Sequence, residues 1–390
     1  MNRAVVVGAG VLGACVAYHL ARAGVEVVVL EEAGPASGTS GATFAADVTH
    51  LKTPHTYYRL NRQGSDGHRA LADELDGPDW RHPAPLVQWA DSDEAQRSLR
   101  ERADRVREWG HDCRTAPASV LRELAPAVDP AACAVGEIVV HDATAWFDAP
   151  RLVHALLDAA VRRHGAETHY GTRVTGLRRA ADGTGIVGVE AGDRSWGADA
   201  VVNCAGPAAD QIAALAGQRL PLRHVPGLVA ETGPPAEGPL TAILSAPGID
   251  LRPTADGGVL ALSWEVDARL NGAGHDGLAA ELHRRASTVV PGLGASRIAD
   301  ARIGVRPVPL DGLPLVGEAA TAPGLYHLVS HSAVTLAPVL GRLAARELTS
   351  GRQAEELGAY RPGRAVADGD VQDENLRAMN HRGSNPQPKV

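Results

Sequence analysis

Residues 4–32, AVVVGAGVLGACVAYHLARAGVEVVVLEE, decide the fold. The apolar run at residues 5–7 predicts a short buried strand, and the helical spacing of residues 14–23 predicts a helix that ends at Gly24. Residues 27–30 predict a second strand. A strand, a glycine-rich turn, a helix and a second strand in this order indicate a nucleotide-binding α/β unit.

Three glycines between the first strand and the helix have the spacing GxGxxG. Gly8 allows the tight turn, Gly10 lets the backbone approach a pyrophosphate, and Gly13 lets the helix pack closely on the strand. The N-terminus of the helix then meets the phosphates with oriented N–H groups and a partial positive charge. Glu31 follows the second strand, where an acid accepts hydrogen bonds from ribose hydroxyls. An acid there disfavours NADP and leaves both NAD and FAD open.

The composition is typical of a soluble globular enzyme. A chain of 390 residues exceeds the size of one core, so we expect two domains. The net charge of −8 argues against a nucleic-acid partner, which needs a concentrated basic face. No apolar run is long enough to span a membrane, and the early start of the first strand leads us to expect no signal peptide. The 4 cysteines have no metal-binding spacing, so we expect free thiols and a cytoplasmic location.

The order of the remaining elements indicates that the nucleotide-binding domain is interrupted. Residues 91–109 predict an exposed, highly charged helix, and residues 149–165 predict an amphipathic helix. Residues 220–265 are strand-like with frequent Pro and Gly, which predicts an antiparallel sheet. Residues 321–351 again predict a strand, a turn and a helix. Nucleotide-binding segments therefore alternate with those of a second domain.

Four stretches resemble the FAD-dependent D-amino-acid oxidase superfamily, in particular its glycine oxidase and sarcosine oxidase branch. They are the glycine turn with VVVLEEAGPASGTSGATFA, ETHYGTRVTGLRR, ADAVVNCAGPAADQIAALAG and, most specific, ARIGVRPVPLDGLPLVGEAATAPGLYHLVSHSAVTLAPVLGRLAARELTSG. The resemblance extends to about residue 350 and implies that the glycine turn binds FAD. The competing interpretation is an NAD-dependent dehydrogenase. Such an enzyme usually has a continuous nucleotide domain of six parallel strands, whereas here the strand–helix alternation breaks after two strands.

The resemblance also implies the domain organisation, an α/β + α+β architecture. A discontinuous Rossmann-like FAD-binding domain is expected at residues 1–47, 144–217 and 297–360, interleaved with an antiparallel-sheet substrate domain at residues 48–143 and 218–296. Residues 361–390 have little apolar patterning and are expected to form a flexible C-terminal tail.

In this family the adenine meets the backbone of a strand, here at Val174, and the N-terminus of the last helix points at the pyrimidine end of the flavin. Residues 331–336 would supply backbone N–H groups there, although HSAV stands where the family usually has glycine. RPVPLDG has no cysteine, and no histidine lies between GTSGATF and His50, so we expect non-covalent FAD. The predicted FAD-binding residues are Gly8, Gly10, Val11, Leu12, Gly13, Glu31, Glu32, Thr39, Ser40, Phe44, Ala45, Ala46, Val174, Gly206, His331, Ser332, Ala333, Val334, Thr335 and Leu336.

The resemblance implies oxidation of a C–N bond in an amino acid or N-substituted amino acid. Hydride passes from the α-carbon to flavin N5, the imine is hydrolysed to an oxo acid and an amine, and O₂ reoxidises the flavin to give H₂O₂. Two alternatives stay open: a dehydrogenase with another electron acceptor, and a non-catalytic flavin-bearing subunit of a complex.

Five residues are candidates for contact with the substrate or oxygen. Arg306 stands where glycine oxidases bind the substrate carboxylate, and His331 replaces a second arginine, which weakens the case for glycine as substrate. Asp250 and Arg252 share one face of a predicted strand, where Asp250 would receive a cationic group. Lys52 follows the flavin loop and would assist oxygen. The alternatives are that Arg306 is a structural arginine on a turn and that His331 is an ordinary loop histidine. Asp250 would then be a solvated carboxylate, and Lys52 a surface lysine.

Overall fold

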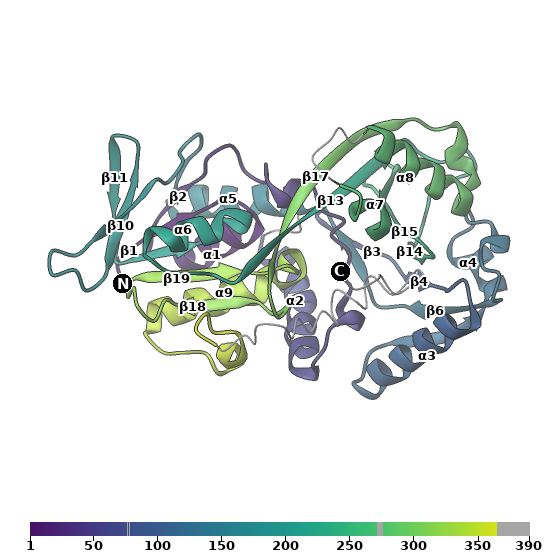
Figure 1. The fold of residues 1–390 in the computed structure, drawn as a ribbon, viewed down its shortest axis with the longest axis horizontal. Helices are drawn as coiled ribbons and strands as arrows, with labels where there is room; N and C mark the ends of the chain where they lie inside the picture. Colours follow the sequence, from purple (N-terminus) through teal and green to yellow (C-terminus); the bar gives the residue numbers. More distant parts are fainter. Residues whose placement is uncertain (76, 78, 271–275, 365–390) are drawn as a thin grey trace.

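The computed structural model describes residues 1–75, 77, 79–270 and 276–364. These residues form two bodies that lie side by side, each built around its own large β-sheet (Figure 1). Two long strands, β13 (Leu222–Thr232) and β17 (Ile298–Pro309), run together from one body toward the other. The mixture of a parallel sheet and antiparallel sheets confirms the predicted fold class.

A six-stranded sheet forms the centre of the first body. Its spatial order is β18 (Leu315–Glu318), β19 (Leu325–Val329), β12 (Ala200–Asn203), β1 (Arg3–Val7), β2 (Glu26–Leu30) and β8 (Glu167–His169). Neighbouring strands are parallel, except that β18 pairs antiparallel with β19 at one edge. The predicted strands at residues 5–7 and 27–30 are the adjacent strands β1 and β2, and their valines are buried.

Helices cover one face of this sheet, and a small sheet with one helix covers the other. On the first face α1 (Val11–Arg22), α5 (Ala149–His164) and α9 (Ala333–Ser350) pack on Ala4 and Val6. On the second face α6 (Ala209–Leu215) and the antiparallel strands β9 (Gly176–Arg179), β10 (Ile186–Ala191) and β11 (Arg194–Gly197) pack on Val5 and Val7. The alternation of side chains along β1 therefore supplies two separate cores.

An eight-stranded sheet forms the centre of the second body, and α8 (Asp276–Val289) packs against it. Its order is β17, β13, β16 (Val259–Leu262), β15 (Ile249–Pro253), β14 (Ile243–Ala246), β4 (Leu86–Gln88), β6 (Glu137–His141) and β5 (Cys113–Pro117). All pairs are antiparallel except β14 with β4. The remaining elements are α3 (Asp93–Glu108), α4 (Leu121–Leu124), α7 (Trp264–Asp267), and the pair β3 (Arg81–Pro83) and β7 (Ala145–Phe147).

Two segments lie in a different body from the one expected. β17 falls within residues 297–360, which were predicted to belong to the FAD-binding domain, yet it pairs along its length with β13 of the eight-stranded sheet. Conversely, α2 (His55–Glu74) was predicted in the substrate domain but packs against α9, and Tyr57 and Leu60 join the core of the first body. Local patterning shows that a helix is amphipathic, but it cannot show which sheet the apolar face meets.

The start of the predicted C-terminal tail is anchored. Arg361 forms an ion pair with Glu347 of α9, with 2.6 Å between Nη2 and Oε1, and Arg364 forms one with Asp311. Residues 361–364 of the predicted flexible tail thus contact the first body, and residues 365–390 lie outside the described residues. Paired arginines hold this segment in place although it has few apolar side chains.

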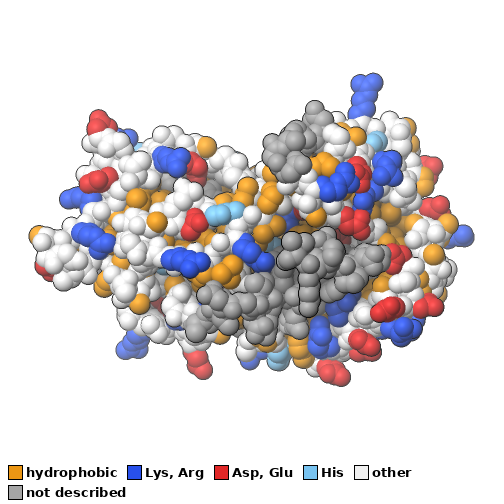
Figure 2. All heavy atoms as spheres, viewed as in Figure 1, with side chains coloured by type: hydrophobic (Ala, Val, Ile, Leu, Met, Phe, Trp, Pro, Cys, Tyr) orange, Lys and Arg blue, Asp and Glu red, His pale blue; other side chains and the backbone are white. Residues whose placement is uncertain are grey.

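The described helices include none with both the length and the apolar composition needed to cross a bilayer. On the face drawn in Figure 2, basic and acidic side chains are interspersed over both bodies, with apolar side chains between them.

The contact between α1 and α9 depends on Gly341. A Cβ at this position would lie 2.7 Å from Sγ of Cys15 and 3.0 Å from its backbone carbon. Gly341→Val should therefore lower the free energy of unfolding by about 1–3 kcal/mol, the usual cost of overpacking a core. Urea unfolding of the purified protein measures this loss. Gly294→Val is the matched control, since no atom lies within 4 Å of a Cβ there; equal losses in the two variants would contradict the close packing.

Candidate active site

Three neighbouring cavities share lining residues and lead from the first body to the eight-stranded sheet. The nucleotide cavity is lined by Gly8, Gly10, Glu31 and Glu32, and by residues 172–175 and 204–208. The middle cavity shares Gly10, Thr39 and Ser40 with it and reaches the start of α9. The third, which we call the reaction pocket, shares Thr39, Thr43, His331 and Val334 with the middle cavity and opens toward the eight-stranded sheet. An elongated ligand with phosphates at its centre therefore fits along the three cavities.

Each of the three glycines in the first turn meets a different structural requirement. Gly8 has φ 104°, and a Cβ there would lie 2.5 Å from the carbonyl oxygen of Cys204. A Cβ at Gly13 would overlap the carbonyl of Gly8, which is why the helix can approach the strand. A Cβ at Gly10 would meet only Oγ of Ser40, at 3.2 Å, so Gly10 keeps cavity space open rather than avoiding a clash with the backbone. The predicted roles of the three glycines agree with this geometry.

Glu31 lies at the mouth of the nucleotide cavity. Its carboxylate accepts hydrogen bonds from the N–H groups of Ala9, at 2.8 Å, and Ala33, at 3.0 Å. These bonds fix the acid against the glycine turn, where a ribose would pass. Val174 also lines the cavity, but it lies two residues before β9 rather than on a strand as predicted.

The loop after β2 and the start of α9 form the walls of the next two cavities. Oγ of Ser40 accepts the N–H of Val11 at 3.0 Å, which satisfies one donor of the first turn of α1. Phe44, Ala45 and Ala46, which were predicted to bind FAD, line the reaction pocket. Gly206 lies between the nucleotide and middle cavities.

The N-terminus of α9 faces the middle cavity and the reaction pocket. Ala333, Val334 and Thr335 lie in its first turn, whose N–H groups have no acceptor within the helix. Leu336 was predicted to donate to the flavin, and this prediction is wrong: its N–H donates to the carbonyl of Ser332 at 3.1 Å, and its side chain is fully buried. One helical turn is enough to satisfy an N–H group internally, so the first turn of α9 leaves the N–H groups of Ala333, Val334 and Thr335 for a ligand.

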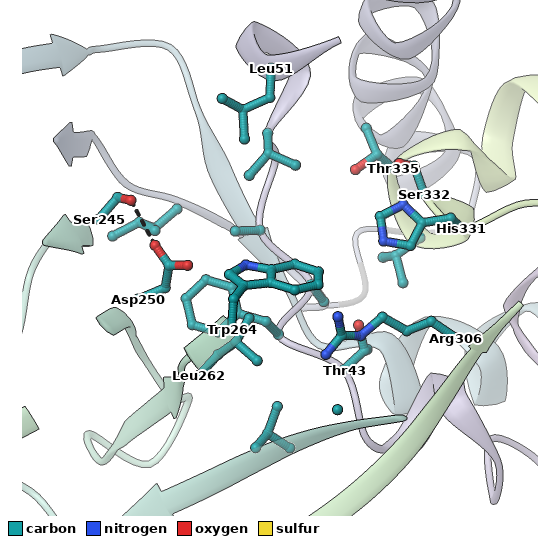
Figure 3. A pocket seen from close by; sticks show the side chains of 18 of the residues that line it. Thr43, Leu51, Ser245, Asp250, Leu262, Trp264, Arg306, His331, Ser332 and Thr335 are labelled. Carbon is teal, nitrogen blue, oxygen red and sulfur yellow. Dashed lines mark hydrogen bonds between the residues drawn. The ribbon is translucent and has the colours of Figure 1, made fainter. Parts of the chain in front are cut away.

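Arg306 projects into the reaction pocket from β17, and its side chain is 14% exposed. One guanidinium nitrogen, Nη2, donates to the carboxylate of Asp267, while Nη1 has no partner among the described residues. The guanidinium carbon lies 4.1 Å from the centre of the Trp264 ring. Gly227 on β13 leaves room for it, since a Cβ there would overlap the guanidinium. The arginine is thus held in a fixed orientation with one nitrogen free (Figure 3).

Sequence reasoning missed the two residues that hold this arginine. Trp264 and Asp267 are three residues apart on α7, so they lie on the same face of the helix and meet one guanidinium. Asp267 also accepts the N–H of Leu228 at 2.8 Å, and its burial raises the pKa of the carboxyl, which the charge of Arg306 opposes. The signal in the sequence is SWEVD, an aromatic and an acid at helical spacing, but nothing local connects it with Arg306.

Lys52 lines the same pocket and is 1% exposed, so the surface-lysine interpretation is wrong. Its Nζ has no hydrogen-bond partner among the described residues and lies 5.9 Å from the centre of the Tyr57 ring. Burial lowers the pKa of Lys52 to about 8, although the Asp47 carboxylate raises it. The ammonium form is therefore present at neutral pH and is lost as the pH rises through about 8.

His331 lies across the pocket from Trp264 and close to Arg306 (Figure 3). Burial lowers the pKa of His331 well below its ordinary value, and the positive charges of Lys52 and Arg306 lower it further. The imidazole is therefore neutral at physiological pH and offers one donor and one acceptor to a ligand.

Asp250 and Arg252 lie on β15, but only Asp250 lines the pocket. Asp250 accepts the hydroxyl of Ser245 at 2.6 Å. The guanidinium of Arg252 is instead turned to the loop after β2, where it donates to the carbonyl of Phe44. It also donates to the carbonyl of Pro253, and its carbon lies 4.6 Å from the centre of the Trp146 ring. Arg252 thus holds the loop, and the expectation that it faces the substrate does not fit its position.

The open space at Gly10 leads to a test. Gly10→Val should abolish retention of FAD while the protein stays folded, because the added side chain meets only Ser40 and occupies the path of the pyrophosphate. Flavin absorbance per protein after gel filtration, together with circular dichroism, measures both effects. Gly34→Val is the control, since nothing lies within 4 Å of a Cβ there. Normal flavin content in Gly10→Val would place the phosphates elsewhere.

Comparison with known proteins agrees with this geometry. A family model described as FAD dependent oxidoreductase matches residues 3–347. The uncharacterized oxidoreductase YurR of Bacillus subtilis (strain 168) is 28% identical over 395 residues, covering 94% of this chain and 100% of that protein. Glycine oxidase of Pseudomonas aeruginosa is 26% identical over 359 residues, covering 90% and 96%.

The same fold occurs in a solved structure. Glycine oxidase from Geobacillus kaustophilus superposes with a TM-score of 0.83 at 24% identity, covering 94% of this chain and 100% of that one. The glycine turn, the acid at position 31 and the start of α9 line one elongated cavity, and the family model spans all of them. The chain therefore belongs to the FAD dependent oxidoreductase family, and its cofactor is FAD.

Proposed function

We propose that the protein oxidises a C–N bond adjacent to a carboxylate, in an amino acid or an N-substituted amino acid. The observation that supports this most is Arg306, a buried arginine of the reaction pocket whose Nη1 has no partner among the described residues and which lies next to the start of α9. A guanidinium in such a place favours a planar anion such as a carboxylate. Glycine oxidase of Pseudomonas aeruginosa, a relative along nearly its whole length, agrees with a substrate of this class.

The pocket supports the chemistry through position and charge. FAD supplies a hydride acceptor when it is bound. The substrate carboxylate pairs with Arg306, which orients the α-carbon within the pocket. The N–H groups of Ala333, Val334 and Thr335 stabilise negative charge at the neighbouring end of the flavin. The imine product then hydrolyses to an oxo acid and an amine.

Asp250 and His331 determine which substrates fit. Asp250 lies on the other side of Trp264 from Arg306 (Figure 3), and we assign to it the binding of a cationic group on a larger substrate. His331 is neutral and stands beside the proposed carboxylate position, so it contributes a hydrogen bond rather than a second positive charge. Because a neutral histidine stands where glycine oxidases have a second arginine, the pocket favours a substituted amino acid over glycine.

We also propose that FAD is held without a covalent bond and that O₂ is the electron acceptor. Among the residues that line the reaction pocket and the middle cavity, Cys204 is the one cysteine, and burial raises the pKa of its thiol far above the ordinary value. A thiol in this state is a poor nucleophile. Acid precipitation should therefore release the yellow flavin into the supernatant, and flavin in the pellet would contradict this assignment.

A peroxide-coupled screen of purified protein tests the function. D-amino acids, glycine, sarcosine and larger N-substituted amino acids are supplied, and H₂O₂ is measured. Turnover that reduces a dye but forms no peroxide would favour a dehydrogenase. An isolated chain that binds FAD and oxidises none of these compounds with either acceptor would favour a flavin-bearing subunit.

Removal of the arginine should weaken catalysis without loss of flavin. Arg306→Ala is expected to lower kcat/KM for an α-carboxylate substrate. The loss of transition-state stabilisation should be about 2–5 kcal/mol, the scale for a desolvated charge pair that loses one member. Arg306→Lys should recover little, because a point charge replaces a planar fork. Steady-state kinetics and flavin content measure both.

Gly227→Ala provides the matched variant. It retains Arg306 and its charge but displaces the guanidinium, since a Cβ at Gly227 would overlap it. An increase in KM with normal flavin content is expected. Unchanged kinetics in Gly227→Ala and Arg306→Ala together would assign carboxylate binding to another group.

Substitution of Lys52 should affect the two half-reactions differently, namely reduction of the flavin by substrate and its reoxidation by oxygen. If its ammonium stabilises the superoxide that forms next to reduced flavin, Lys52→Met should slow reoxidation by roughly a hundred- to a thousand-fold and leave reduction by substrate nearly unchanged. Rapid mixing of substrate with oxidised enzyme without oxygen, and of reduced enzyme with oxygen, measures the two rates. In the wild-type protein the reoxidation rate should fall as the pH rises through about 8, the pKa of Lys52. Slower reduction alone would place Lys52 on the substrate side.

A further inference from the structure

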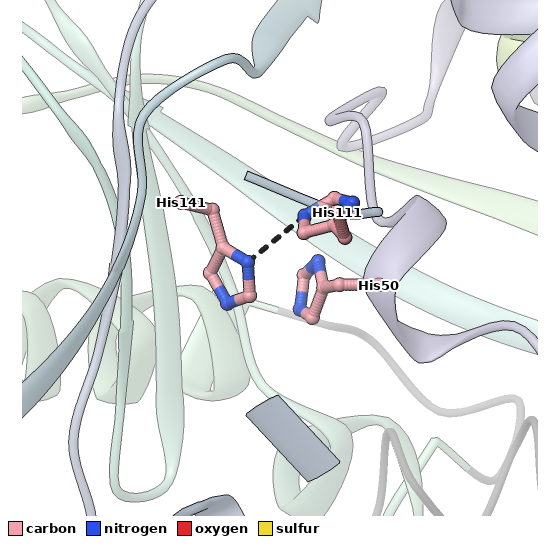
Figure 4. Close-up of side chains that lie close together, drawn as sticks. All are labelled: His50, His111 and His141. Atoms are coloured by element: carbon pink, nitrogen blue, oxygen red, sulfur yellow. Dashed lines mark hydrogen bonds between the residues drawn. The ribbon is translucent and has the colours of Figure 1, made fainter. Parts of the chain in front are cut away.

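Three buried histidines that do not themselves line the reaction pocket come together beside the eight-stranded sheet. His50 lies in the 3₁₀ helix η2 (Thr49–Leu51), His111 in the loop between α3 and β5, and His141 at the end of β6. Each offers a ring nitrogen, and the three nitrogens lie within 4.8 Å of one another (Figure 4). Nε2 of His111 and Nδ1 of His141 are 3.1 Å apart. Three segments far apart in the sequence thus converge on one point.

His111 and His141, whose facing nitrogens are 3.1 Å apart, each contact a further side chain through their other ring nitrogen. Nε2 of His141 lies 3.0 Å from Oε1 of Gln88, and because an amide oxygen only accepts, this nitrogen carries the proton. Nδ1 of His141 therefore has its lone pair directed at the cluster. Nδ1 of His111 lies 3.4 Å from the hydroxyl of Tyr58. A second residue that fixes the remote nitrogen of each imidazole is the arrangement around metal-binding histidines.

The hydroxyl of Tyr58 allows His111 to change its tautomer. Without a metal, the hydroxyl donates to Nδ1 of His111, and Nε2–H donates to Nδ1 of His141. When the proton moves to Nδ1, the same hydroxyl rotates and accepts it, because a hydroxyl both donates and accepts. The lone pair on Nε2 then faces the cluster. Gln88 and Tyr58 can therefore support neutral imidazoles with both lone pairs directed inward.

The three imidazoles are shielded from solvent. The exposed fractions of His50, His111 and His141 are 4%, 7% and 1%. A small cavity beside His50 and His141 is lined also by Arg102 and by apolar residues of α3.

We propose that His50, His111 and His141 bind one divalent transition-metal ion, with Zn²⁺ as the fitting ion and a small exchangeable ligand in the fourth position. Imidazole nitrogen suits Zn²⁺, and tetrahedral coordination at about 2.0–2.1 Å places two nitrogens about 3.4 Å apart. The 3.1 Å pair is close to this spacing, and the ring of His50 lies beside it, with its centre 4.1 Å from that of the His141 ring.

The metal has a structural consequence for the active site. It cross-links η2, the loop after α3, and β6, and η2 ends one residue before Lys52. Fixing the backbone at His50 therefore fixes the segment from which Lys52 enters the reaction pocket. Metal binding can be tested independently of the proposed substrate, because its measurement does not require turnover.

The test uses the full-length, flavin-loaded protein after dialysis against a chelator. Titration with ZnCl₂, followed by gel filtration and elemental analysis, should give one equivalent of zinc per chain and a higher melting temperature. CoCl₂ should give the intense visible bands of tetrahedral cobalt at wavelengths longer than the flavin absorption. Zinc near zero equivalents in the wild-type protein would overturn the proposal, whatever the variants do.

Matched variants assign the metal to these residues. His111→Asn and His141→Asn should lose the bound metal, while His154→Asn, at an exposed position on α5, should retain it. Gln88→Leu preserves all three ligands but removes the contact behind His141, and should weaken zinc affinity about 10- to 100-fold. Flavin content verifies that each variant is folded. Equal zinc binding by the wild-type protein, His111→Asn and His141→Asn would show that the ion binds elsewhere and would overturn the assignment.

Discussion

The convergence of two helix N-termini on one cavity is the constraint on which the rest of the structure depends. Val11 and Leu12 at the start of α1, and Ala333 and Val334 at the start of α9, line the same middle cavity. The helices can converge because Gly341 of α9 lies directly against Cys15 of α1. Two positive helix ends at this place favour a ligand with negative charge along its length. FAD carries such charge in its pyrophosphate, and its flavin ring gains it on reduction.

The two bodies cooperate because neither contains the complete site. The first body supplies the phosphate turn and the start of α9, and the second supplies Arg306 with its supports on α7 and β13. The guanidinium is buried, so its charge has low dielectric screening and interacts strongly with an incoming carboxylate. Asp267 and Trp264 compensate the desolvation of this cation. The pocket can therefore hold a fixed positive charge before the substrate arrives.

Positive charge is concentrated around the reaction pocket although the chain has a net charge of −8. Lys52 and Arg306 both lower the pKa of His331, which shows that the two cations act on one small volume. Within an apolar wall such a potential favours every anion that the proposed reaction produces or consumes. The overall charge of a protein thus says little about the charge that a substrate meets.

The sequence by itself determined the local elements and the nucleotide site. β1, α1, β2 and α5 follow from apolar periodicity and from glycine positions, because these depend on contacts between residues close in the chain. The resemblance in the glycine turn and in the last strand and helix was enough to identify FAD. Only the tertiary structure decided that β17 belongs to the eight-stranded sheet, that Asp267 and Trp264 hold Arg306, that Lys52 is buried, and that three histidines meet. Each of these depends on residues separated by tens to hundreds of positions, and such contacts arise from how apolar faces pack rather than from any local pattern.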